Sequence, residues 1–300
     1  MIRHKKLGYV ALNVSNLERS VAFYRDHAGL DLVELDEGKQ AFMSCNADHH
    51  NILLVQAATP SLKRIAYELE DPSQIAVAEQ VLTDAGVAFE RVSDAECGRL
   101  RMGSALRFRD PNGVPFELFS GMVSRPQKFL PHPADLSHLS HAVVKVPEFK
   151  KSVEFYRNVM NFRVSDFRHE SSGEPYFAFM RCFPNPYHHS FAIIEAPKAA
   201  FFHIAFTVRS LDDLMFGRNR LKKAGITVAP TPGRHMASGS VFQYFADPDG
   251  FTLEYTFGME EFPEHGARQP RMLDKSYRTT DVWDGERPTN MPDYGLIEAA

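Results

Sequence analysis

The chain has 300 residues, and its content of 44% hydrophobic and 24% charged residues is typical of a globular protein of about two domains. The 34 Lys and Arg against 38 Asp and Glu give a formal net charge of −4, so no basic surplus is available to neutralise phosphates and we expect no nucleic-acid partner. No run approaches the ~18 consecutive apolar residues of a membrane span, and the three cysteines lack CxxC spacing, so we expect a cytoplasmic protein without a zinc ribbon, a disulfide framework or membrane contact.

Four segments of the first half recur in the second half in the same order. LGYVALNVSNLERSVAFYRD at 7–26 matches LSHAVVKVPEFKKSVEFYRN at 139–158, an offset of 132 (139 − 7). Three further pairs match at offsets of 139, 139 and 137: NADHHNILLVQ with NPYHHSFAIIE, LTDAGV with LKKAGI, and RDPNGVPFELFSG with ADPDGFTLEYTFG. Four collinear matches indicate a duplicated domain.

Each half divides again into two similar units. The first unit opens with a strand pattern (YVALNV or HAVVKV) that leads into a helix with one apolar stripe, and Ser15 and Glu18 have the spacing of a capping box. The second unit has a strand (IAYELED or HIAFTVRS), a helix through 80–85 or 215–224, and a closing strand after a DPNG or DPDG turn. The chain therefore predicts an α+β fold of four βαβββ modules, with curved mixed sheets in two tandem domains.

The two halves differ at positions that could bind a metal. His141 stands where the first half has Tyr9, and His203 stands where it has Arg64, whereas Glu254 has a glutamate counterpart in the first half. Strand alternation points His203 and Glu254 to the small, polar faces of their strands, as a cavity would require. Two imidazoles and one carboxylate leave positions of an octahedral ion open, which is typical of non-haem Fe(II) that handles oxygen rather than of a closed zinc site.

Structural roles are the alternative for each of these residues. A single strand histidine is more often a partly buried structural residue than a ligand. The loss of both His141 and His203 from the first half favours a ligand role for the pair. For Glu117, the counterpart of Glu254, we expect either a surface position or pairing with an arginine.

Three further polar residues are less decisive on their own. The HisHis pair at 188–189 recurs at 49–50, so a shared structural role in a turn is an alternative for both pairs. His235 lies in a Gly-rich loop and Tyr244 in a strand pattern, and neither position indicates a function by itself.

At these residues the chain resembles the type I extradiol ring-cleavage dioxygenases of the vicinal oxygen chelate superfamily, which include catechol 2,3-dioxygenases and 2,3-dihydroxybiphenyl 1,2-dioxygenases. The resemblance rests on SHAVVKV, SVEFYRN, HHSFA, HIAFTV, GRH with a Tyr nine residues after its His, and DPDG with a Glu on the next strand. It covers nearly the whole chain. It implies that His141, His203 and Glu254 bind Fe(II), with Mn(II) as a possible substitute.

The same resemblance implies a reaction. His189 would be the acid–base histidine, and His235 and Tyr244 would hydrogen-bond the bound substrate oxygen. The substrate would be a catechol-type aromatic diol that reacts with O₂ and opens beside its two hydroxyls to a hydroxymuconic-semialdehyde-type product, in aromatic catabolism. The family also implies a homo-oligomer.

These interpretations divide the chain into four segments. We expect a non-catalytic N-terminal domain, a Pro-containing linker, a metal-binding catalytic domain, and a tail that wraps the surface or contacts a partner subunit. Their boundaries are 1–123, 124–137, 138–258 and 259–300.

Two other functions remain open. One is another metalloenzyme on the same scaffold, either a hydroquinone-cleaving dioxygenase or a glyoxalase-like isomerase, although Tyr9 and Arg64 offer no fourth ligand of the glyoxalase type. The other is a metal-free module that binds a small molecule. Such a module has no use for a complete triad of ligands.

Overall fold

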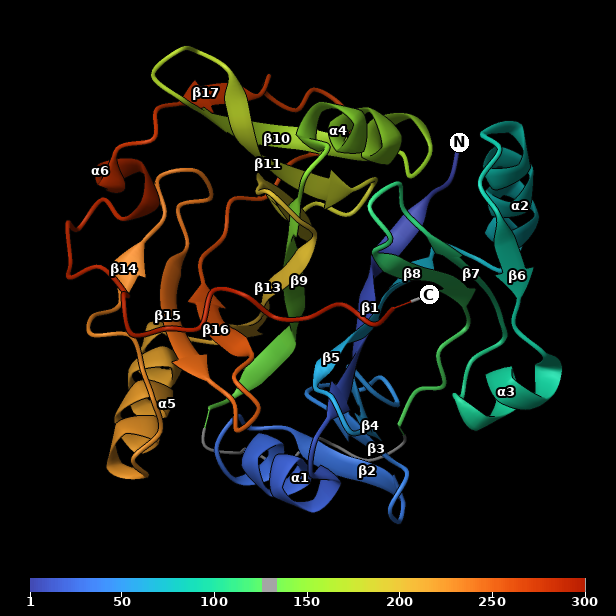
Figure 1. Cartoon of the computed structure of the whole chain (residues 1–300), viewed down its shortest axis with the longest axis horizontal. Helices are drawn as coiled ribbons and strands as arrows, with labels where there is room; N and C mark the ends of the chain where they lie inside the picture. The colour runs from blue at the N-terminus through green and yellow to red at the C-terminus, as the bar shows by residue number, and fades with distance from the viewer. Residues whose placement is uncertain (126–133, 300) are drawn as a thin grey trace.

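The first half builds one mixed sheet from two βαβββ modules, in a computed structural model that describes residues 1–125 and 134–299 (Figure 1). Residues 126–133 of the expected linker lie outside the described residues. The first module comprises β1 (His4–Val14), α1 (Leu17–Asp26), β2 (Asp31–Asp36), β3 (Gln40–Ser44) and β4 (Ile52–Gln56). The second comprises β5 (Ser61–Leu69), α2 (Gln74–Asp84), β6 (Phe89–Arg91), α3 (Asp94–Arg99), β7 (Ser104–Arg109) and β8 (Pro115–Ser120). The strand order is β2-β3-β4-β1-β5-β8-β7-β6.

The second half repeats this plan. Its first module comprises β9 (Leu136–Val146), α4 (Phe149–Asn158), β10 (Phe162–His169), β11 (Pro175–Cys182) and β12 (Phe191–Glu195). Its second comprises β13 (Ala200–Val208), α5 (Leu211–Lys223), β14 (Gly233–Arg234), β15 (Val241–Ala246) and β16 (Thr252–Phe257). The strand order is β14-β15-β16-β13-β9-β12-β11-β10-β17, in which β17 (Arg271–Leu273) comes from the tail. The predicted arrangement of four βαβββ modules is confirmed, and α3, β17 and α6 (Tyr277–Thr280) are additions to it.

Strand alternation separates the core from the site. On β13, Ile204 and Phe206 are buried in the main hydrophobic core, as are Leu253 and Tyr255 on β16. Their neighbours in sequence therefore face the opposite side of the sheet, as the period of two predicts.

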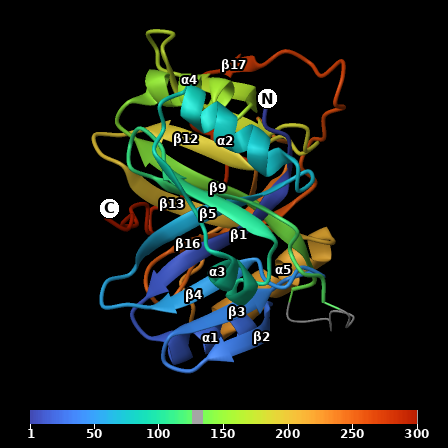
Figure 2. The same ribbon diagram turned by 90° about the vertical axis from the view of Figure 1, so that its right-hand side faces the viewer.

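The two halves interlock through their helices and turns. Tyr24 on α1 donates a hydrogen bond to Asp247 in the DPDG turn of the second half (3.1 Å), and Tyr156 on α4 donates one to Asp110 in the DPNG turn of the first half (2.6 Å). Each half thus covers part of the other, and Figure 2 shows α2 and α4 at one end of the molecule with α1 at the opposite end.

The expected capping box of α1 is wrong. Asn16 caps the helix, because its side chain accepts a hydrogen bond from the backbone N–H of Arg19 at 2.9 Å. Ser15 instead donates its hydroxyl hydrogen to Asp249 at 2.5 Å, across the boundary between the halves. Ser15 therefore binds a residue 234 positions away in sequence instead of capping the helix as its local spacing had suggested.

The tail, which was expected either to wrap the surface or to contact a partner subunit, lies along the surface of both halves. After β17 and α6 it passes along the second half and returns to the first, where Ile297 and Glu298 lie beside β5 and β1 (Figure 1). Gly295 forms a bridge with Phe201, and Ile297 forms one with Leu62. Within the described residues, none of the helices has the length and apolarity needed to cross a membrane.

His4 connects the halves in a buried environment that should make the fold sensitive to acid. Its Nε2 lies 2.6 Å from the carbonyl oxygen of Met160, and burial lowers its pKa to about 4, although this hydrogen bond opposes the shift. The unfolded chain protonates His4 near pH 6.5, so its contribution to stability is complete above that pH and is lost as the pH falls toward 4.

We therefore expect the wild-type protein to lose about 2 kcal/mol more unfolding free energy between pH 7 and pH 5 than His4→Gln, which keeps an N–H donor but does not titrate. Urea unfolding of both proteins at the two pH values measures the difference. Equal losses in the two proteins would refute this role of His4.

Candidate metal centre

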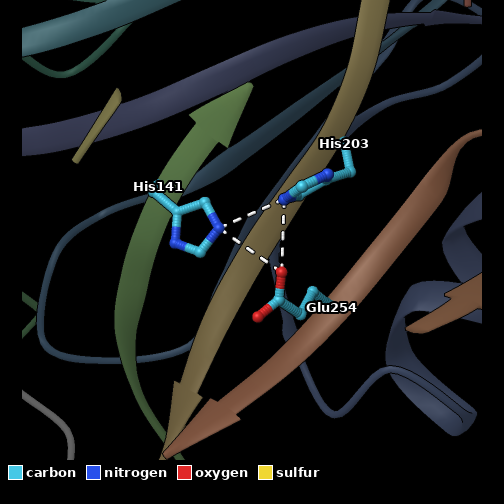
Figure 3. A group of neighbouring side chains, drawn as sticks. All are labelled: His141, His203 and Glu254. Carbon is cyan, nitrogen blue, oxygen red and sulfur yellow. Dashed lines mark hydrogen bonds and ion pairs between the residues drawn. The ribbon is translucent and has the colours of Figure 1, made fainter. Parts of the chain in front are cut away.

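Sheet register brings three predicted ligands onto one face of three neighbouring strands. β13 pairs with β9 on one side and with β16 on the other, and Ala205 at its centre is paired with both His141 and Glu254. His203 lies two residues before Ala205 and therefore on the same face. Figure 3 shows the three polar groups pointing toward one another.

The distances between the three groups fit ligands of one ion. The two histidine Nε2 atoms are 3.2 Å apart, and Glu254 Oε2 lies 3.2 Å from His203 Nε2 and 3.4 Å from His141 Nε2. Nitrogen and oxygen atoms at right angles on an ion about 2.1 Å away would be about 3 Å apart. All three side chains are buried, and together they form a group that could hold a metal ion.

The charges of the group also favour a cation. Neither carboxylate oxygen of Glu254 has a hydrogen-bond donor of suitable geometry among the described residues. Burial alone would raise the pKa of Glu254, but His141 and His203 hold it well below its usual value. Burial lowers the pKa of His203 to about 4, so this imidazole is neutral at pH 7. A buried carboxylate beside neutral imidazole lone pairs is a donor set that fits a divalent metal ion.

The other three predicted residues surround this group. His189 lies in the segment between β11 and β12, and the centroid of its ring is 4.2 Å from the centroid of the His141 ring. Tyr244 on β15 is paired in register with Glu254, and its hydroxyl lies 3.4 Å from Nε2 of His235. Burial lowers the pKa of His189 well below its usual value and raises that of Tyr244 well above its own.

The first half uses the same frame without metal ligands. Ala66 is paired with both Tyr9 and Glu117, as Ala205 is with its two partners. Tyr9 donates a hydrogen bond to Glu117 (2.6 Å), Arg64 donates to the Tyr9 hydroxyl (2.8 Å), and Arg107 donates to Glu117 (2.8 Å). Glu117 is paired with arginine as expected, but it is fully buried, so the expectation of a surface position is wrong.

A second polar group, which was not predicted from the sequence, lies beside His189. His188 contacts His189 through Nδ1 (3.0 Å) and Asp166 through Nε2 (2.9 Å), and Arg268 and Arg271 of the tail bind the same carboxylate. A signal for Asp166 exists, since an acid stands 132 residues earlier in the first half, at the offset of the first repeat. The arginines have no repeated counterpart and carry no such signal.

Known proteins are similar to this chain in sequence and in fold. The model of the Glyoxalase/Bleomycin resistance protein/Dioxygenase superfamily matches residues 6–118 and 138–255. A 1,2-dihydroxynaphthalene dioxygenase of Sphingobium xenophagum is 28% identical over 273 residues, which cover 86% of this chain and 90% of that protein. A biphenyl-2,3-diol 1,2-dioxygenase of Paraburkholderia xenovorans is 30% identical over 264 residues, covering 84% and 87%. The crystal structure of a Mn(II)-bound glyoxalase from Novosphingobium aromaticivorans has a TM-score of 0.85 at 28% identity and covers 100% of this chain and 99% of that one.

The metal assignment can be tested at equivalent positions of the two halves. His203→Ala removes one imidazole, so we expect the metal content of anaerobically purified protein to fall about tenfold or more. Arg64→Ala changes the matching residue of the first half and should leave the metal content unchanged. Elemental analysis of the folded proteins measures both, and full metal content in His203→Ala would contradict the assignment.

Proposed function

Because the chain belongs to the Glyoxalase/Bleomycin resistance protein/Dioxygenase superfamily, as a type I extradiol dioxygenase, we propose that it opens the ring of a catechol-type aromatic diol with O₂ beside the two hydroxyls. The observation that carries this proposal is the buried group of His141, His203 and Glu254, which offers two imidazoles and a carboxylate to one ion. We propose Fe(II) as that ion. Mn(II) is the alternative, since the same donor set suits both.

The division of the chain follows from where these ligands lie. We propose that residues 138–258 form the catalytic domain and that residues 1–123 are non-catalytic. Arg64 and Arg107 support this division, because their guanidinium groups occupy the charge-compensating role beside Glu117 that a metal would otherwise take.

The residues of the chain hold the metal and move protons. When bound, the ion supplies the redox chemistry that lets O₂ react with a diol whose electrons are all paired. His141 and His203 are neutral donors in this proposal, and Glu254 provides a single negative charge. With a divalent ion bound, the site would carry a net positive charge and would attract an ionised diol oxygen.

His189 is the proposed acid–base residue. Its lowered pKa keeps the imidazole neutral and able to accept a phenolic proton. Both atoms of O₂ enter the ring-opened product, so the product in its acid form holds every hydrogen of the diol, and its new carboxyl group then ionises in neutral water. We propose that the proton that His189 takes from the diol is returned as the ring opens, so that one group serves as base and then as acid.

His235 and Tyr244 are proposed to orient the substrate oxygen. The carbonyl oxygen of Thr280 lies 2.7 Å from His235 Nδ1, so this nitrogen carries the proton. The Nε2 of His235, which faces Tyr244, is then a lone pair that can accept a hydrogen bond from a protonated diol oxygen. The raised pKa of Tyr244 keeps its hydroxyl protonated, so this hydroxyl can donate a hydrogen bond to an ionised oxygen of the diol.

Oxygen uptake by anaerobically reconstituted protein across a set of substituted catechols tests the reaction. We expect Fe(II)- or Mn(II)-loaded protein to consume one O₂ per diol and to form a yellow ring-opened product. Since one relative is a glyoxalase, isomerisation of the hemithioacetal of methylglyoxal and glutathione is assayed in parallel. Isomerase activity without oxygen uptake would replace the proposal.

His189→Asn should separate binding from oxygen chemistry. We expect wild-type metal content and diol affinity, with turnover slower by roughly 100-fold or more because the acid–base group is gone. His50→Asn, at the matching position of the first half, is the control and should turn over normally. Wild-type turnover in His189→Asn would return His189 to a structural role in its turn.

A further inference from the structure

Asp166 is a buried carboxylate that the proposed reaction does not use. It lies on β10 and is fully buried. Arg268 donates to its two oxygens at 2.9 and 3.1 Å, and Arg271 donates from its backbone N–H at 2.8 Å and from its guanidinium at 2.5 Å. Burial alone would raise the pKa of Asp166, but hydrogen bonds from His188, Arg271 and Arg268 hold it well below its usual value. Asp166 is therefore ionised at neutral pH and accepts hydrogen bonds only.

An ionised Asp166 determines where the protons lie on two histidines. His188 Nε2 is 2.9 Å from Asp166 Oδ2, so Nε2 carries a proton and donates it to the carboxylate. Burial lowers the pKa of His188, although Asp166 opposes the shift, so His188 is neutral and its Nδ1 is a lone pair. His189 Nδ1, 3.0 Å away, must then carry the proton of that contact. This leaves the Nε2 of His189 as the unprotonated nitrogen.

We propose that Asp166 and His188 form a positioning relay that presents His189 to the substrate as a base through Nε2. This inference rests on the proposed function. When His189 accepts a proton on Nε2, its positive charge is stabilised through the hydrogen bond to His188 and on to the Asp166 carboxylate. Neither relay residue touches the substrate, and both act through His189.

The first half contains a looser version of the same arrangement. His49 and His50 contact each other through Nδ1 at 3.2 Å, and Glu34 lies 3.4 Å from His49 Nε2 with its side chain 39% exposed. Arg101 is the arginine that binds Glu34 there. The HisHis turn of the first half therefore forms without a close, buried carboxylate contact to its first histidine. The half that carries the metal ligands has a shorter carboxylate contact, full burial and two arginines.

The tail closes this arrangement around the site. The backbone N–H of His188 donates to the carbonyl oxygen of Glu260 at 2.8 Å, so the tail also holds the relay histidine. Arg271 additionally donates to the carbonyl oxygen of Ala237 at 2.5 Å, in the loop that carries His235. The guanidinium of Arg271 thus contacts both the Asp166 carboxylate and the loop that carries His235.

Two substitutions of His188 separate a relay from a merely structural contact. His188→Asn keeps an amide near the position of Nδ1 and can still accept the proton of His189, but it cannot reach Asp166. His188→Gln keeps an amide near the position of Nε2 and can donate to Asp166, but it offers His189 no acceptor. A structural role predicts that Gln is the better replacement, whereas the relay predicts that Asn is.

We expect His188→Gln to lower kcat by about 10–100-fold and His188→Asn to retain kcat within about tenfold of wild type, both with unchanged metal content and diol affinity. A second measurement uses 4-nitrocatechol bound without O₂, whose absorption reports how many phenolic protons it has lost. Wild type and His188→Asn should bind it doubly ionised, and His188→Gln singly ionised. His49→Gln in the first half is the matched control and should behave as wild type.

Higher kcat in His188→Gln than in His188→Asn, equal kcat in both, loss of metal in step with loss of kcat, or an unchanged nitrocatechol spectrum in His188→Gln would overturn the relay. Should His188→Gln not fold, Asp166→Asn takes its place, and wild-type kcat in that variant overturns the relay as well. Absence of oxygen uptake by the wild-type protein would instead refute the proposed function itself, so the two failures are distinct.

Discussion

A carboxylate that is removed from water must meet positive charge or lose its own charge, and two such carboxylates lie at equivalent positions of this duplicated fold. Glu117 is compensated by Arg107 and Arg64, whose guanidinium nitrogens lie 2.8 and 3.6 Å from it. Glu254 instead lies beside the edges of two imidazoles, whose nitrogens are common metal ligands. The same backbone frame therefore creates either a closed ion-pair cluster or a place for a cation, according to which side chains surround the glutamate.

This constraint explains why the glutamate alone is common to both halves. In each half the glutamate lies on an outer strand of three paired strands, in register with an alanine of the middle strand, and either surrounding satisfies its charge. Where the first half has Tyr9, Arg64 and Arg107, the second half has His141, His203 and Tyr244, and this difference removes the fixed positive charge and opens a site for a mobile ion. The remaining fold need not change, since Ala66 and Ala205 have the same partners in register in the two halves.

Strand period and repetition account for what could be predicted from the sequence. Alternation assigns His203 and Glu254 to one face, and comparison between halves identifies which histidines are specific to one of them, so the modules and the ligand group were predictable. Alternation does not reveal what covers a face. A surface position was for this reason one of the two alternatives expected for Glu117, whereas Cys97 of α3 and the adjoining Leu100 and Met102 pack on that side of the first sheet. The prediction of the α1 cap was wrong for a related reason, because the hydroxyl of Ser15 binds Asp249 of the other half.

The tail lies outside the repeat, and its contacts could not be inferred from either half. Arg268 and Arg271 reach Asp166 across 102 and 105 residues of sequence, and Thr280 orients His235 across 45. The ligands are thus supplied by repeated modules, whereas the residues proposed to move and orient protons are held by a segment present once. A duplicated frame can supply two equal faces, and the tail contacts the two halves through different segments. Arg268, Arg271 and Thr280 support the site of the second half, whereas Ile297 and Glu298 lie against the first. The unequal chemistry of the two halves then follows from the ligands and from this asymmetric support together.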